Sequence, residues 1–226
     1  MASGTKLLND DGSASMATLL MMSHHALRRD LGRFQTALAR VKAGDATRVE
    51  ALQNEWKGYH MALHGHHAQE DGGIFPDLRE KQPALRDVID RLASDHRRID
   101  PLLEKGDAAF AALPNATEAE AVISELTALL DEHLTLEEAN VVPHLRGFAS
   151  FPAPPNEEML GMYAQGFSWS MQGIAPEVSA EVSKMLPAAL IARLPAAQVA
   201  FAERCEKVWG SAKVGISTTS VPAPLP

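Results

Sequence analysis

The sequence predicts an all-α protein: an up-down-up-down four-helix bundle built from two helical hairpins, with a C-terminal helical extension. From about residue 15 to residue 144, apolar residues recur at steps of three and four, the spacing of one face of an α-helix. The sequence lacks the sustained alternation of apolar and polar residues that would indicate a β-strand. The segments between the periodic stretches are short, so consecutive helices are expected to lie antiparallel.

Each of the four expected helices has its own apolar stripe, and residues that favour caps or breaks separate the stripes. Gly44 should end the first helix and Asp45 should cap the second. The second should end at the Gly72–Pro76 segment, which contains poor helix formers. Thr117 and Glu120 have the spacing of a capping box, which would open the fourth helix. The stripes read Leu20, His24, Leu27, Leu31, Phe34 and Leu38; Leu52, Trp56, Tyr59, Leu63, His66 and Glu70; Leu85, Ile89, Leu92, His96, Ile99 and Leu103; and Leu126, Leu130, His133, Glu137 and Val141.

The sequence as a whole divides into four predicted regions. Residues 1–14 should be a flexible N-terminus, 15–150 the four-helix bundle, 151–210 the helical extension and 211–226 a disordered tail. Prolines make 151–156 a linker, and glycines weaken any helix around Trp169. Two short helices are expected around 178–186 and 195–208. The extension is expected to pack on the bundle or on a partner subunit, which would make a homodimer.

Composition and charge exclude several classes of function. The chain has 226 residues, a formal net charge of -8 and a pI near 5.6. It lacks the clustered Lys and Arg that phosphate contacts require, so no nucleic-acid partner is expected. No stretch has the character of a signal peptide or a membrane span, which predicts a cytoplasmic protein without membrane contact. Cys205 is the only cysteine, so any bound metal must use His, Asp and Glu.

One sequence motif occurs in two similar copies. Residues 66–79 read HHAQEDGGIFPDLR and residues 133–146 read HLTLEEANVVPHLR. Each copy has His-x3-Glu, followed by an acidic residue, an apolar pair, Pro, Leu and Arg. A histidine and a carboxylate four residues apart lie on one face of a helix, one turn apart. A further histidine precedes each copy, His24 and His96, so the two halves of the bundle offer similar sets of ligands.

The burial of so many ionisable side chains in one layer predicts a metal site. An isolated buried charge is unfavourable by roughly several kcal/mol unless it is paired or binds a metal. Imidazole and carboxylate together suit iron, manganese or zinc, and carboxylates between two histidine clusters suit two ions. Six ligands over two ions leave open positions that small molecules can fill. The expected ligands are His24, His66, Glu70, His96, His133 and Glu137, with the two glutamates as bridges.

The doubled motif resembles the haemerythrin family of HHE cation-binding domains over about residues 15–145. The resemblance implies a four-helix bundle that holds two iron ions, a non-haem di-iron centre bridged by two carboxylates and an oxo or hydroxo group. Zinc or manganese would be substitutes. Carried over to this sequence, the resemblance gives His24 and His66 to one iron, His96 and His133 to the other, and Glu70 and Glu137 to both.

The sequence departs from the oxygen-carrying haemerythrins, which have His-x3-His on the third helix where this chain has His96-x3-Asp100. The carriers also have a longer spacing to an Asp on the fourth helix. The chain therefore looks more like the bacterial and sensor-type members, which favours binding or reduction of dioxygen, hydrogen peroxide or nitric oxide. The enzymatic form would be a catalase- or peroxidase-like or nitric-oxide-handling reaction.

Two other functions remain as alternatives. In the first, the protein is an iron- or oxygen-sensing module whose metal state controls a partner interface through the C-terminal extension. The second, iron storage in a ferritin-like shell, fits less well because those bundles use Glu-x-x-His.

Several other histidines lie close to the predicted ligands in the sequence. His25 is adjacent to His24 and falls off the apolar stripe, so we expect it at the surface. His60, His64 and His67 share a second face of the second helix. A polar, half-exposed face is favoured there over a second metal site.

Two further residues have alternative roles. Asp100 lies one turn beyond His96 and is either an additional ligand or a polar surface residue. Tyr59 lies two turns before His66, so its hydroxyl either reaches the metal pocket as a catalytic group or belongs to a core tyrosine.

Overall fold

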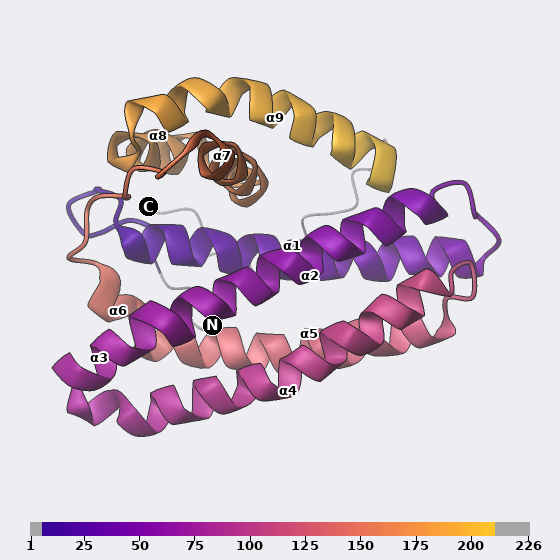
Figure 1. The fold of residues 1–226 in the computed structure, drawn as a ribbon, viewed down its shortest axis with the longest axis horizontal. Coiled ribbons are helices and arrows are strands. Elements are labelled where there is room, and N and C mark those ends of the chain that lie inside the picture. The colour runs from indigo at the N-terminus through magenta and orange to yellow at the C-terminus, as the bar shows by residue number, and fades with distance from the viewer. Residues whose placement is uncertain (1–5, 211–226) are drawn as a thin grey trace. The chain divides into compact units, whose positions relative to one another are not determined.

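The computed structural model describes residues 6–210, which are helical with no strand among them and confirm the all-α class (Figure 1). The chain divides into two compact units. The terminal unit spans Met1–Arg29 and Val141–Pro226, and the central unit spans Asp30–Asn140. None of the helices between residues 6 and 210 combines the length and apolarity needed to cross a bilayer. The predicted tail, 211–226, lies outside the described residues.

Four helical segments build the central unit: the second half of α1 (Met16–Lys42), α2 (Val49–Gln69), α4 (Arg86–Ala111) and α5 (Thr117–Asn140). α4 and α5 lie side by side, and α2 packs on α4 (Figure 1). An aromatic cluster from three of these segments comprises Phe34, Trp56, Tyr59 and Phe110. Trp56 stacks on Phe110 with ring centroids 4.6 Å apart and planes 6° apart. The predicted apolar stripes thus form the core of this unit.

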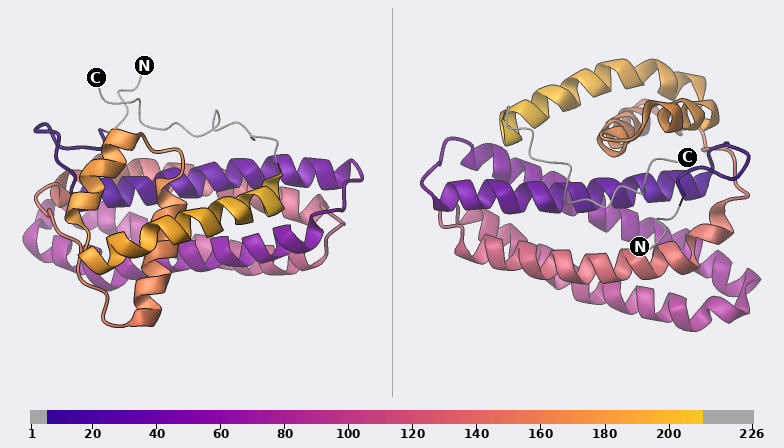
Figure 2. Two further views of the ribbon diagram at one scale, coloured as in Figure 1. Left: turned by 90° about the horizontal axis from the view of Figure 1, so that it is seen from above. Right: turned by 180° about the vertical axis from the view of Figure 1, so that it is seen from behind.

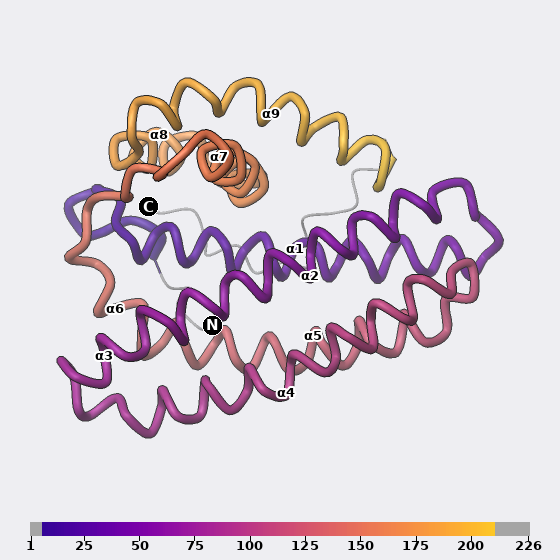
Figure 3. Tube along the Cα trace, in the orientation of Figure 1, coloured from indigo at the N-terminus to yellow at the C-terminus, as the bar shows by residue number. Residues whose placement is uncertain are grey.

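The second helix does not end at the glycines, so that prediction is wrong. α2 passes into a π-helical turn, Glu70–Ile74, and then into α3, Phe75–Lys81 (Figure 3). The backbone N–H of Phe75 donates to the carbonyl of Glu70, which closes the wider turn. Pro76 stands in the first turn of α3, where a missing N–H is tolerated. Turns of this kind are frequent at functional sites.

Neither predicted helix cap forms as expected. Asp45 accepts hydrogen bonds from the N–H and hydroxyl of Thr47, in a local turn before α2, and these bonds lower the pKa of its carboxyl. The carboxylate of Glu120 accepts a hydrogen bond from Lys42 Nζ at 2.6 Å. A contact between α1 and α5 thus replaces the capping box, because the lysine ammonium is the stronger donor for a carboxylate.

The terminal unit contains the first half of α1, α6 (Val142–Leu145), α7 (Glu157–Met171), α8 (Pro176–Met185) and α9 (Ala188–Trp209). α9 crosses over α7 and packs against it (Figure 2). The side chain of Asn156 caps α7 by accepting a hydrogen bond from the N–H of Met159 at 2.8 Å. α7 runs through Gly161 and Gly166 and includes Trp169, so a helix forms there in spite of the glycines.

His25 is buried, with 3% of its surface exposed, and the prediction of a surface position is wrong. Its Nε2 donates to the carbonyl of Gln172 at 3.0 Å. Arg29, one turn further along α1, donates from Nη1 to the carbonyls of Trp169 and Gln172 at 2.9 and 3.0 Å. Carbonyls at the C-terminal end of a helix have no partner within the helix. These α1 side chains bind the end of α7, which the stripe analysis of α1 alone does not reveal.

Replacing Arg29 with alanine should destabilise the protein by about 2 kcal/mol, because hydrogen bonds from a charged donor each contribute about 1.5–3 kcal/mol. The guanidinium also lies 5.9 Å from the centroid of the Trp169 ring. Lys184→Ala, at an exposed lysine on α8, is the control and should change the free energy of unfolding by less than about 0.5 kcal/mol. Equal urea midpoints for the two variants would contradict this role of Arg29.

Candidate metal centre

Two clusters of metal-ligand side chains, all buried except the half-buried His66, lie within the central unit. His67, His96 and His133 form the three-histidine group, and His66, Glu70 and Glu137 form the carboxylate group. In each group the side chains offer ligand atoms that lie within 4.8 Å of one another. Both groups draw on α2 and α5; α4 adds His96 to the three-histidine group, and the π-helical turn adds Glu70 to the carboxylate group. Helices that are far apart in the sequence therefore bring these side chains together in the core.

Glu70, a member of the carboxylate group, also lies close to the three-histidine group. One of its carboxylate oxygens, Oε1, is 2.9 Å from Nε2 of His66, and the other, Oε2, is 3.3 Å from Nε2 of His96. Its side chain is completely buried, as is that of Glu137. An oxygen of Glu137 lies 4.0 Å from Nε2 of His133. Each glutamate thus lies within reach of both clusters, as the bridging arrangement requires.

His96 is held from several sides. Its Nδ1 donates to the carboxylate of Asp71 at 2.9 Å, and its ring stacks on those of Phe75 and His67. Burial alone would lower the pKa of His96, but hydrogen bonds to Glu70 and Asp71 outweigh burial and raise the pKa. Because Asp71 occupies Nδ1, the other ring nitrogen, Nε2, faces Glu70. A carboxylate behind a histidine in this way fixes the tautomer and orientation of a metal ligand.

Asp71→Ala should weaken metal binding by about tenfold, the lower end of what is typical when a residue that orients a ligand is lost. The imidazole of His96 would lose the acceptor that fixes its tautomer. Asp77→Ala is the matched control: both carboxylates are 46% exposed, and within residues 6–210 Asp77 forms an ion pair only with Lys81. Competition with a chelator measures the affinity. Identical affinities in the two variants would exclude an orienting role for Asp71.

The structure places the other sequence-predicted residues as follows. His24 lies in α1 within the terminal unit, with its side chain fully buried, and its role as a ligand stays a prediction. Asp100 is half-buried on α4 and belongs to neither group among residues 6–210. Tyr59 packs against Phe34, with ring centroids 5.8 Å apart, and burial raises the pKa of its phenol well above the usual value. The role of Tyr59 in chemistry also stays a prediction.

Of the three histidines expected on a half-exposed face, one is buried. His60 is half-buried and its Nδ1 lies 3.0 Å from a carboxylate oxygen of Asp107, while His64 is exposed. His67 is only 3% exposed and joins the three-histidine group, so the prediction of a half-exposed position is wrong for this residue. The two adjacent histidines, 66 and 67, were the feature of the sequence that could have indicated a second buried ligand. A single apolar stripe, however, includes only one of two adjacent residues.

The chemistry of the donor set fits metal ions. Imidazole nitrogens and carboxylate oxygens are gathered in a buried position, which is costly unless the charges are paired or bind a metal. Two nitrogens at about 2.1 Å from one ion lie at most about 4.2 Å apart. In a tetrahedral site that separation is about 3.4 Å, so an ion would draw together by up to about 1.4 Å those ligand atoms that lie as far as 4.8 Å apart.

A helical bundle with two adjoining buried groups of His and Glu defines a metal-binding class of protein. The family model described as the Hemerythrin HHE cation binding domain matches residues 15–145, more than half of the chain. The chain therefore belongs to this family of cation-binding domains, as its doubled motif indicates. Neither a curated protein nor a solved structure matched the chain.

Proposed function

We propose that the chain is a non-haem di-iron protein that binds or reduces a small oxidant, dioxygen, hydrogen peroxide or nitric oxide, at a carboxylate-bridged site. The observation that supports this most directly is the position of Glu70. Its two oxygens lie 2.9 and 3.3 Å from histidines of different groups. A single carboxylate shared in this way suits two neighbouring ions better than one.

The donor set supports iron, with zinc or manganese as substitutes, because imidazole and carboxylate ligands suit these metals. The described part of the chain has one cysteine, Cys205 on α9, and it belongs to neither ligand group, so the ligands are imidazoles and carboxylates. With His24 included, the six ligands predicted from the sequence leave coordination positions open for a small molecule. Iron, when bound, supplies the electrons that a small oxidant accepts, and the buried side chains hold it away from bulk water.

Anaerobic loading with ferrous iron tests the proposal. We expect about two irons per chain and, after oxidation, a charge-transfer absorption band in the near ultraviolet. Metal analysis of the freshly purified protein gives the native content. A protein that takes up no iron, or that holds only zinc, would overturn the proposal.

The enzymatic version of this function consumes hydrogen peroxide. The neutral phenol of Tyr59 is the candidate proton donor, with the buried glutamates assisting. Peroxide consumption should fall strongly in His24→Ala and Glu137→Ala, and less in Tyr59→Phe. Unchanged turnover in both ligand variants would exclude the enzymatic version, although iron binding could still be tested separately.

A second candidate, a sensing module, is favoured by one feature of the terminal unit. The predicted ligand His24 is adjacent to His25, whose ring donates to Gln172 at the end of α7. A change in metal state that moves this turn of α1 would reach α7 directly. Hydrogen exchange of residues 157–209 should then differ between the iron-loaded and iron-free protein. Identical exchange in both states would argue against the sensing module.

A further inference from the structure

His67 has no counterpart in the second copy of the repeat. In the first copy His66 is followed by His67, and in the second copy His133 is followed by Leu134, which is completely buried. His67 is also buried, and neither of its ring nitrogens has a hydrogen-bond partner among the described residues. An imidazole therefore occupies a position where the other half of the bundle uses an apolar side chain.

Burial of this imidazole without a partner is unfavourable, since an unsatisfied polar group costs about 1–3 kcal/mol. A neutral imidazole keeps a lone pair on one of its ring nitrogens. A neutral imidazole is the form of histidine that binds metal.

The surroundings of His67 show what its lone pair can reach. The ring stacks on that of His96 with centroids 3.9 Å apart and planes 14° apart, and it lies edge-on to His133 at 5.5 Å. One ligand nitrogen from each of the three rings lies within 4.8 Å of the others. These rings come from α2, α4 and α5, so they approach the same point from three helices.

We propose that His67 is a seventh metal ligand, which together with His96 and His133 gives one ion three histidines. This inference rests on the proposed di-metal function. The helix α4 provides one histidine, His96, and Asp100 one turn further along is half-buried and outside both groups. The third imidazole is instead that of His67, on the neighbouring helix α2. The other ion would keep the carboxylate group and the predicted ligand His24.

The test is His67→Leu, which copies the residue found in the second half of the repeat. We expect the variant to keep one tight metal ion and to bind the other at least 10-fold more weakly, since even the loss of a residue that orients a ligand costs 10- to 100-fold. X-ray absorption at the iron edge should show one imidazole fewer per chain. Without metal, the variant should be as stable as the parent or more so, because leucine removes an unsatisfied polar group.

His64→Leu is the matched control, because His64 is exposed one turn earlier on α2. It should leave both metal affinities unchanged. His67→Gln, a polar replacement, should show the same weakening of one ion and guards against a folding defect specific to leucine.

The outcomes separate the inference from the proposed function. If the parent protein binds no iron, the proposed function fails before any variant is made. If the parent binds two ions and His67→Leu and His67→Gln bind them equally well, the inference is overturned while the function stands. A metal-free His67→Leu protein that is less stable but binds metal normally would make His67 a structural residue and would also overturn the inference.

Discussion

Replacing Glu70 with alanine is expected to weaken the binding of both metal ions by at least about 100-fold, because the loss of a residue that only orients a ligand already costs 10- to 100-fold. Glu70 is completely buried and faces a histidine of each group through a different oxygen. The loss should therefore affect both ions together. Variants of His67, in contrast, should weaken the binding of only one of the two ions.

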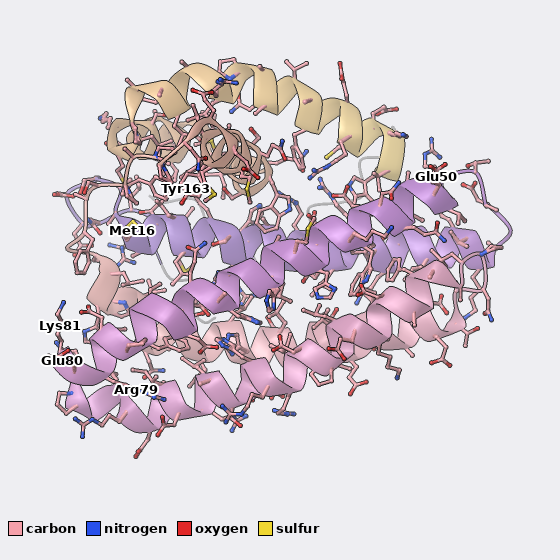
Figure 4. All side chains as sticks on the ribbon, in the orientation of Figure 1. Met16, Glu50, Arg79, Glu80, Lys81 and Tyr163 are labelled. Carbon is pink, nitrogen blue, oxygen red and sulfur yellow. The ribbon has the colours of Figure 1, made fainter. Side chains whose placement is uncertain are left out.

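Glu70→Gln separates the loss of charge from the loss of volume, since the amide has nearly the same shape but only one carbonyl oxygen. It should also lose both ions. Glu80→Ala, at an exposed position near the end of α3 (Figure 4), is the control and should bind as the parent does. Metal content after gel filtration and chelator competition give the affinities. Two tightly bound ions in Glu70→Ala would exclude a bridging role.

Gly106→Ala is expected to destabilise the central unit by roughly 2 kcal/mol. A Cβ atom at this position would lie 2.0 Å from Cζ2 of Trp56, which is 1% exposed. The indole cannot move easily, because it stacks on Phe110 and its Nε1 donates to Asp107 at 2.8 Å. Overpacking of a core costs about 1–3 kcal/mol and sometimes more, which exceeds the gain of about 0.5–1 kcal/mol for removing a helical glycine.

Gly58→Ala on α2 is the matched control with the opposite sign. Nothing lies within 4 Å of a Cβ added there, so alanine should stabilise by up to about 1 kcal/mol through helix propensity. Urea denaturation gives both free energies of unfolding. Trp56→Phe should restore part of the loss in Gly106→Ala, because the smaller ring frees the space. Equal stability of the two glycine variants would contradict the packing argument.

The sequence allowed the helices and the ligand pairs to be predicted because both depend on local spacing. A histidine and a carboxylate four residues apart lie on one face whatever surrounds the helix, and His66 with Glu70, and His133 with Glu137, are brought together as expected. The repeat added the information that two such pairs belong to one structure. The buried position of Glu70 follows from the same periodicity.

Other features depend on packing that the local pattern does not contain. The turn after Gln69 is π-helical, and the chain continues through it into α3 instead of ending at the glycines. His25 is buried because the end of α7 lies against it. His67 is buried because the rings of His96 and His133 surround it. An apolar stripe predicts which face of a helix is buried. His25 and His67 lie on another face of their helices, which is buried by contacts with other segments of the chain.

The sequence by itself thus determined the all-α class through its apolar spacing, and the family resemblance and the two His-x3-Glu pairs through the doubled motif, since spacing along one helix fixes which side chains share a face. Only the tertiary structure decided that His67 joins His96 and His133, and that Glu70, in the carboxylate group, also lies close to the three-histidine group. The physical reason is that burial and the distances between ligands on different helices depend on helix packing, to which residues far apart in the chain contribute.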